Sequence, residues 1–116
     1  METITLIIND APYGNERPWN ALRLAGAFMA IKQKVNIFLL GDAVAIAKKG
    51  QKTPTGYYNT AQMIKELVGS GANIRACGTC LNSRGIEENE LVEGVLVGKM
   101  LDVARWAEGS AKVITF

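Results

Sequence analysis

The sequence contains no histidine. Because imidazole is the usual general base beside a catalytic thiol and a common metal ligand, its absence excludes Cys–His catalysis and His-containing metal sites within one chain. An excess of one charge is also missing, since the net charge is only +2 and the one basic cluster is Lys48, Lys49 and Lys52. Such a cluster is typical of a solvated loop, so we expect no nucleic-acid partner.

Long apolar runs are absent as well, because no stretch approaches the roughly 18 residues that a membrane span requires. The chain starts at Met1 and continues into an apolar run, without a basic leader region or a small-residue cleavage site. These features predict a cytoplasmic protein with no membrane partner, where thiols stay reduced. A chain of 116 residues, 48% hydrophobic and 21% charged, is expected to form one globular domain over residues 1–116.

Only two cysteines are present, Cys77 and Cys80, within the stretch IRACGTCLNSRG. A disulfide between them would close too small a loop to stabilise the fold, so the pair indicates chemistry. The open interpretations are a thioredoxin-type redox pair, half of a zinc site shared across an interface, a nucleophilic thiol with a neighbour, and two small core residues. Zinc is disfavoured because one chain supplies only two thiolates, and a thioredoxin-type pair because no proline follows Cys80.

Strand and helix patterns alternate along the chain. Strands are predicted at 3–8, 34–40, 72–76, 93–98 and 111–116. Helices are predicted at 17–32, 43–49 and 60–68, after the cysteines up to Gly85, and along a stripe from Val97 to Ala107. This alternation predicts an α/β fold with a parallel, doubly wound sheet.

In such sheets ligands bind outside the carboxyl ends of the strands. Three segments share that edge: 9–16, 41–58 and 77–80. Cys77 lies where a strand ends and a helix begins, so the first-turn amides and the Arg84 side chain are expected to favour its thiolate. Cys80, expected on the inward side of the short helix, is explained equally well as a core residue.

Four segments, taken in order, resemble the DsrE/DsrF-like superfamily and, within it, the YchN-like small proteins. They are LIINDAPYGNERPWNALRLAGAF, FLLGDAVAIAKKGQ, IRACGTCLNSRGI and EGVLVGKMLDVARWAEGSAKVITF. The resemblance covers essentially the whole chain, and it implies a three-layer, flavodoxin-like sheet of five strands and assembly as a homotrimer or homohexamer. The broad apolar arc of the predicted helix 17–32, together with Trp19, also favours a partner chain.

In the sulfur-relay members of this superfamily, one cysteine after a central strand accepts a sulfane sulfur as a persulfide and passes it to a partner protein. Those members have a cysteine, seven residues and then a glycine, and Cys77 followed by Gly85 matches that spacing. The resemblance therefore implies that Cys77 carries the sulfur, with donor and acceptor proteins as partners. Cys80 is absent from those members, so a resolving thiol and a core residue remain as its two interpretations.

Three functions are consistent with this sequence. The first is a sulfur carrier without cofactor or metal, in which Cys77 is the nucleophile, Cys80 a resolving thiol and Arg84 a stabiliser of the thiolate. The second is a non-catalytic module that binds a small ligand at the loops 9–16 and 41–58, and the third is a Cys77/Cys80 redox sensor. The residues expected to line the site are Asn9, Asp10, Tyr13, Asn15, Gly78 and Thr79. Turn chemistry alone also explains most of those in the first loop.

Overall fold

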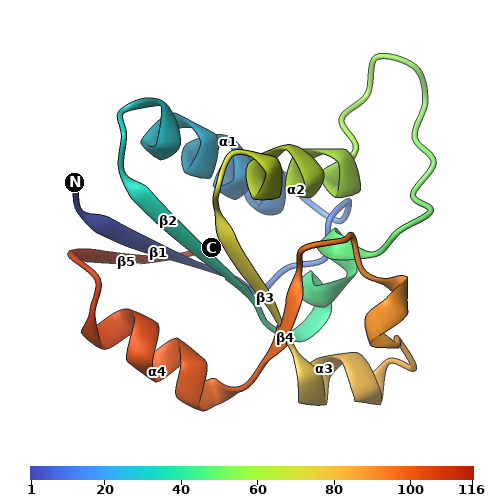
Figure 1. Ribbon diagram of the computed structural model, residues 1–116. Helices are drawn as coiled ribbons and strands as arrows, with labels where there is room; N and C mark the ends of the chain where they lie inside the picture. Colours follow the sequence, from blue (N-terminus) through green and yellow to red (C-terminus); the bar gives the residue numbers. More distant parts are fainter.

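A five-stranded parallel sheet forms the centre of the computed structural model, which describes residues 1–116 (Figure 1). Its strands are β1 (Thr3–Ile8), β2 (Lys34–Leu39), β3 (Asn73–Cys77), β4 (Leu96–Gly98) and β5 (Lys112–Thr115). Their order across the sheet is β4-β3-β2-β1-β5, and every neighbouring pair is parallel. The predicted α/β fold with about five parallel strands is confirmed.

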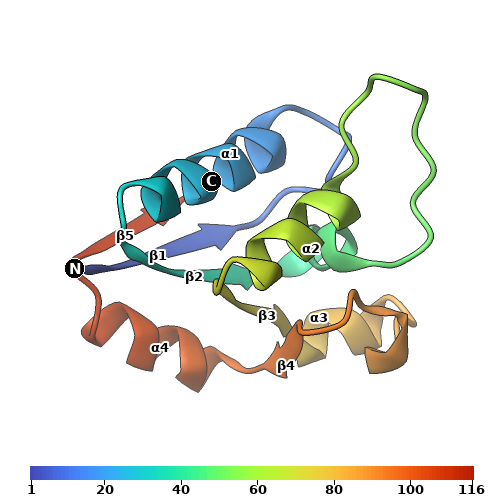
Figure 2. The ribbon, with the colours of Figure 1, turned by 45° about the horizontal axis from the view of Figure 1, so that its top comes forward.

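Helices cover both faces of this sheet, which gives three layers (Figure 2). The helices α1 (Arg17–Ala30) and α2 (Thr60–Gly69) lie on one face, and α4 (Met100–Glu108) lies on the other. The first four strands follow one another across the sheet, so only the connection through α4 runs in the reverse direction, to β5 beside β1. Because crossovers between parallel strands are right-handed, the reversed connection places its helix on the opposite face.

The core is centred on the inner strands. Val35, Ile37, Phe38 and Leu39 of β2 are all at most 1% exposed, which explains why this strand ends in a continuous apolar run and not in an alternating pattern. In contrast, Val113 of the edge strand β5 is 42% exposed. The burial pattern therefore agrees with a sheet that is covered on both faces at its centre and open at its edges.

Some predicted elements differ from the observed ones. The predicted helix 43–49 is a 3-10 helix, η1 (Gly41–Ala47), and a second short 3-10 helix, η2 (Glu88–Glu90), precedes β4. The strand predicted at 93–98 keeps only its last three residues as β4. Helix α1 ends before Lys32, whose φ of 69° lies in the left-handed region. None of the helices combines the length and the apolarity that a membrane crossing requires.

Helix α2 begins with a side-chain N-cap. The Asn59 side chain accepts a hydrogen bond from the Gln62 amide at 3.1 Å, as an N-cap residue does. The Gln62 side chain does not return to Asn59, as a full capping box would require, but donates to Glu66 at 3.2 Å. The cap fixes where α2 begins and therefore where the long loop before it ends.

Candidate functional site

Cys77 is both the last residue of β3 and the N-cap residue of α3 (Gly78–Ser83). Its Sγ accepts a hydrogen bond from the Cys80 amide at 3.3 Å. The residue is 8% exposed, and its thiol is free. The structure thus places Cys77 at the strand-to-helix turn on the carboxyl edge of the sheet, as the sequence predicts.

The pKa of the Cys77 thiol is raised above its ordinary value of 9.0. Burial is the largest cause, and the hydrogen bond to the Cys80 thiol is the second, while the backbone amides of Cys80 and Thr79 act in the opposite direction. The sequence correctly anticipates the amides but not the desolvation that outweighs them. The Cys77 thiol is therefore protonated at neutral pH when the protein is at rest.

Cys80 lies in the first turn of α3 and is only partly buried. Its Sγ accepts a hydrogen bond from the Gly41 amide at 3.2 Å, and its thiol is free. Gly41 begins η1 directly beyond β2, with a φ of +56° that favours glycine. The second sulfur is thus held by the loop after the neighbouring strand, at the carboxyl edge of the sheet, while the partly buried side chain also packs against the core.

Arg84 is bound to a different partner from the one that the sequence suggests. Its Nε and Nη2 donate to Asp42 Oδ1 at 3.1 Å and 2.8 Å, and its Nη1 donates to the Cys80 carbonyl at 3.0 Å. It forms no hydrogen bond with Cys77. The expectation that Arg84 stabilises the Cys77 thiolate is therefore not supported, because the Asp42 carboxylate holds the guanidinium across the gap between α3 and η1.

Asn9 lies on the same edge as Cys77 but not beside it. Extending the strand pairing by one residue places Asn9, Leu40, Cys77 and Gly98 in one row across four strands. Since neighbouring strands are about 4.8 Å apart, Asn9 and Cys77 are separated by roughly 10 Å. The Asn9 side chain instead donates to the Phe116 carbonyl at 3.0 Å, so it ties the loop to the end of the chain.

Asp10 and Asn15 are occupied within their own loop. The Asp10 carboxylate accepts hydrogen bonds from Asn15 Nδ2 and from Arg17 Nη1, both at 3.2 Å. Asn15 Oδ1 accepts from the Arg17 amide at 2.8 Å, at the start of α1. Their roles are those that turn chemistry alone predicts.

Tyr13 connects the first loop to the long loop before α2. Its hydroxyl donates to Gln51 Oε1 and accepts from the Thr60 amide at 3.0 Å. Gln51 Oε1 also accepts from Thr60 Oγ1 at 2.8 Å, and Thr60 is fully buried. Gln51 Nε2 donates to three carbonyls of η1 and its end, those of Ala45, Ile46 and Lys48, at 2.9–3.2 Å. Nothing in the sequence distinguishes this glutamine, because its partners come from three separate segments: the first loop, the start of α2, and η1 with the residue after it.

Trp19, which the sequence suggests as a contact to another chain, is half-buried within one protomer. Its ring stacks on Tyr58 with a centroid separation of 5.0 Å. The central carbon of the Arg23 guanidinium lies 4.6 Å from the centroid of the Trp19 ring. Tyr57 stacks on Tyr58 in turn, at 4.5 Å. The pKa of Tyr58 is raised to about 12, first by hydrogen bonding to Tyr57 and second by burial. These rings fix the end of the long loop on α1.

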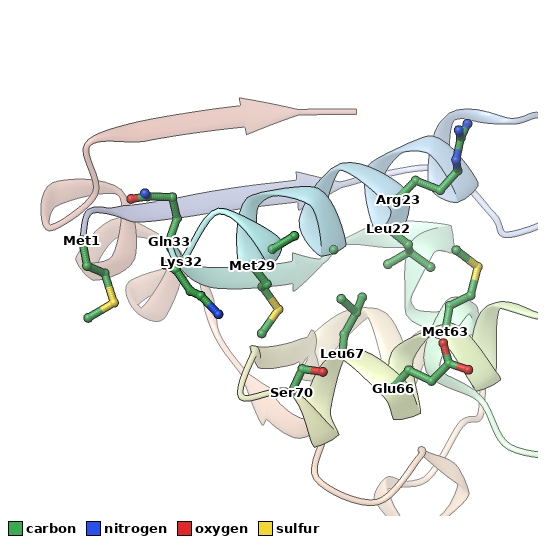
Figure 3. Close-up of a pocket in the computed structure, with 12 residues that line it drawn as sticks. Met1, Leu22, Arg23, Met29, Lys32, Gln33, Met63, Glu66, Leu67 and Ser70 are labelled. Atoms are coloured by element: carbon green, nitrogen blue, oxygen red, sulfur yellow. The ribbon is translucent and has the colours of Figure 1, made fainter.

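The cavities of the molecule lie away from the first loop. The largest, about 850 Å³, is a groove between α1 and α2 with Met29, Met63 and Leu67 in its wall (Figure 3). A cavity of about 320 Å³ reaches the cysteine turn at Gly78, the residue after Cys77, and is bounded by Val97. Thr79 is exposed beside it. None of the four larger cavities is lined by residues of the segment 9–16.

The two cysteines are not part of a larger group of metal-ligating side chains. No three or more Cys, Asp or Glu side chains gather in an arrangement that would hold a metal ion. The chemistry that this edge offers is therefore that of sulfur: two free thiols on one turn, each with a backbone amide directed at it.

Comparison with known proteins agrees with this arrangement. The model of the DsrE/DsrF-like family matches residues 2–116. An uncharacterised protein of Methanopyrus kandleri is 38% identical over 116 residues, which cover 100% of this chain and 95% of that protein. The protein YchN of Escherichia coli is 37% identical over 118 residues and is covered completely, as is this chain (100% of each). The crystal structure of YchN matches with a TM-score of 0.94 over 100% of both chains. The chain belongs to the DsrE/DsrF-like family.

Proposed function

We propose that this protein is a sulfur-relay protein, which carries sulfane sulfur as a persulfide on Cys77 and passes it to an acceptor protein. The observation that carries the proposal is the position of Cys77 Sγ, a free thiol at the carboxyl end of β3 with the Cys80 amide 3.3 Å away. Membership of the DsrE/DsrF-like family supports a role in sulfur relay. An amide donor at the sulfur stabilises the negative charge of the attacking thiolate.

The loading step is an exchange without net oxidation. Cys77 Sγ attacks the outer sulfur of a donor persulfide, a new S–S bond forms, and the S–S bond of the donor breaks. The donor sulfur leaves with the electron pair of that bond and takes up the proton that Cys77 gives up. The products are the Cys77 persulfide and the donor thiol, so neither a cofactor nor a metal is required.

The burial of Cys77 has two consequences for this step. Because the thiol is protonated at rest, loading is expected to be slow until its proton is removed or the turn moves. Once loaded, a sulfur that is 8% exposed is shielded from bulk thiols and oxidants. Slow loading and good retention are the properties of a relay protein, not of a fast general reductant.

A partner chain forms part of this proposal. Several apolar side chains around β4, α4 and β5 are exposed, which a monomer would leave in water. They are Leu96, Val97, Met100, Leu101 and Val113. We propose a homotrimer or homohexamer that buries part of this surface, working in the reducing cytoplasm with donor and acceptor proteins. Sedimentation at micromolar concentration tests the assembly, and a monomer would overturn it.

Binding of a small ligand without chemistry has less support. The first of the two loops expected to hold such a ligand lines none of the four larger cavities, and its side chains bind one another or neighbouring loops. The thiols are the groups on this edge that are left available for reaction.

Intact mass spectrometry after incubation with limiting inorganic polysulfide tests the carrier. The wild-type protein and the Cys80→Ser variant are expected to gain one sulfur atom, and Cys77→Ser is expected to gain none. Cys80→Ser is the matched control, because it removes one thiol from the same turn and leaves the other. If sulfur is gained with Cys77→Ser, or by none of the three proteins, the proposal is wrong.

A further inference from the structure

The two sulfurs of the β3–α3 turn are held by amides from different parts of the chain. Cys77 Sγ accepts from the Cys80 amide at 3.3 Å, within α3, whereas Cys80 Sγ accepts from the Gly41 amide at 3.2 Å, across the gap to η1. Cys77 is the N-cap residue of α3 and Cys80 is its third residue, positions whose side chains face one another. A core cysteine needs no such donor, so this arrangement indicates a thiol that reacts.

We propose that Cys80 is a resolving thiol, which discharges the Cys77 persulfide as hydrogen sulfide when no acceptor protein takes the sulfur. This inference rests on the proposed loading of Cys77 and adds a second outcome for the bound sulfur. The sulfur bound to Cys77 can then leave in two ways, by transfer to an acceptor protein or by release as hydrogen sulfide. The choice between them depends on whether an acceptor arrives before Cys80 reacts.

The discharge step balances within one chain. The Cys80 thiolate attacks Cys77 Sγ, the inner sulfur of the persulfide, and forms the Cys77–Cys80 disulfide. The bond between Cys77 Sγ and the outer sulfur breaks, and the outer sulfur leaves with the electron pair as hydrosulfide. The outer sulfur is reduced, the two cysteine sulfurs are oxidised, and no external oxidant is consumed. A dithiol reductant is needed only afterwards, to reopen the disulfide for another round.

The position of Cys80 favours attack at the inner sulfur. Cys77 Sγ is the sulfur to which the Cys80 amide donates, so it is held close to the residue that attacks it. The outer sulfur extends one bond further from the chain. Attack at the outer sulfur would merely move the persulfide to Cys80, whereas attack at the inner sulfur releases sulfide.

Arg84 and Asp42 act in this step as positioning residues. Arg84 donates to the Cys80 carbonyl at 3.0 Å and to Asp42 Oδ1 at 2.8 Å and 3.1 Å. Asp42 directly follows Gly41, whose amide is bound to Cys80 Sγ. The ion pair thus ties the residue that carries the attacking sulfur to the residue that donates to it. Neither charged side chain forms a hydrogen bond with either sulfur.

A single-turnover experiment tests the resolving role. Wild-type protein and Cys80→Ser are loaded with limiting inorganic polysulfide and desalted, and hydrogen sulfide and intact mass are then followed over time without reductant. The wild-type protein is expected to release one sulfide per loaded chain and to end two hydrogens lighter than the reduced protein. Because an intramolecular thiol is far more effective than water or a distant thiol, Cys80→Ser should release sulfide at least roughly tenfold more slowly.

The outcomes separate this inference from the proposed function. If both proteins load and then hold the sulfur for equal times, carriage is correct and the resolving role is overturned. If neither protein loads, the proposed function itself fails. If the wild-type protein forms the disulfide but releases no sulfide, discharge is overturned as well, because polysulfide has then oxidised the thiols directly.

The positioning role has its own test with matched variants. Removal of one partner of an exposed ion pair has a small effect, so Asp42→Asn should slow discharge roughly twofold to fivefold and leave loading of Cys77 unchanged. Asp42→Glu keeps the carboxylate and should restore most of the rate. Glu90→Gln, which removes the charge from the Lys48–Glu90 pair elsewhere on the surface, is the control. Equal slowing of loading and discharge, or an equal effect of Glu90→Gln, would overturn the positioning role.

Discussion

The turn at residues 77–84 and the loop at residues 48–59 occupy the same carboxyl edge of the sheet (Figure 1). In the loop, Gln51 is bound through both of its side-chain polar atoms, and Tyr57 and Tyr58 are stacked on each other. In the turn, the two thiols are held by amides at 3.2 Å and 3.3 Å. Sulfur is a weak acceptor, so these contacts give way more easily than those of the loop.

This difference separates a scaffold from a site. The loop contains no thiol, and its network fixes the path of the chain between η1 and α2. In the turn the hydrogen bonds to the two sulfurs are weak, which suits a cysteine that must gain a sulfur atom and then lose it to another group. Strong polar networks at a sheet edge therefore do not by themselves mark the reacting residues. If this is so, substitutions in the loop should change stability, and substitutions at the sulfurs should change reactivity.

The largest effect is expected from Gln51→Ala. It removes one hydrogen bond from buried Thr60 and one from each of three backbone carbonyls, which should lower the free energy of unfolding by about 3 kcal/mol. Urea unfolding measures this change, and Gln62→Ala is the control because Gln62 is an exposed glutamine whose side chain binds only Glu66. Sulfur loading of the folded variant should equal that of the wild type. A loss of loading without a loss of stability would mean that the loop belongs to the site.

The next largest effect is expected at Gly98, which pairs with Cys77. A Cβ atom there would lie 2.8 Å from Cε2 of Phe38 and 3.1 Å from Cβ of Arg75. Because overpacking of a filled site costs about 1–3 kcal/mol, Gly98→Ala should destabilise the protein by about 2 kcal/mol in urea unfolding. Gly14→Ala, in the first loop, meets no atom within 4 Å and should change stability by less than about 0.5 kcal/mol. Equal losses of stability in the two variants would show that the packing around Gly98 accommodates an added methyl group as easily as the first loop does.

Within the turn, the two thiols should differ in their rate of alkylation. Cys77 is 8% exposed and its pKa is raised by burial, whereas Cys80 is more exposed. Iodoacetamide at neutral pH is therefore expected to modify Cys80 on the order of tenfold faster than Cys77, as peptide mapping would show. The sulfane label should nevertheless be found on Cys77. Faster alkylation of Cys77 would contradict the burial argument and make Cys80 the better-shielded sulfur.

Local patterns made the sheet and the position of Cys77 predictable. The apolar runs and the turn formers between them define the strands, and the carboxyl ends of parallel strands necessarily share an edge. The same reasoning could not show that Arg84 binds Asp42, because these residues are 42 positions apart and meet only when β2 and β3 are paired. It placed Asn9 on the correct edge but could not show that two strand spacings separate it from Cys77.

The direction of the Cys77 pKa was unpredictable for a different reason. The sequence shows the favourable terms, since a strand-to-helix turn brings amides to the sulfur. It does not show how far β4 and α3 remove that sulfur from water, and burial is the larger effect. The role of Gln51 was hidden in the same way, because a glutamine in a polar loop is distinguished only by partners that the fold assembles.

The smallest expected effect is a change in the alkaline limb of the stability profile. An unfolded chain loses the Cys77 proton at its ordinary pKa of 9.0, while the folded chain keeps it to higher pH. The contribution is fully present below that value and is lost as pH rises through the folded pKa, so stability falls with pH in this window. Tyr58 acts with the same sign, but its window begins at 10.0 and extends to about 12. In urea unfolding at a series of alkaline pH values, Cys77→Ala should remove the earlier part of the decline and Tyr58→Phe only the later part. If Cys77→Ala leaves the slope above pH 9 unchanged, the fold does not hold the Cys77 thiol in its protonated form. The argument that burial of this sulfur sets its reactivity is then wrong.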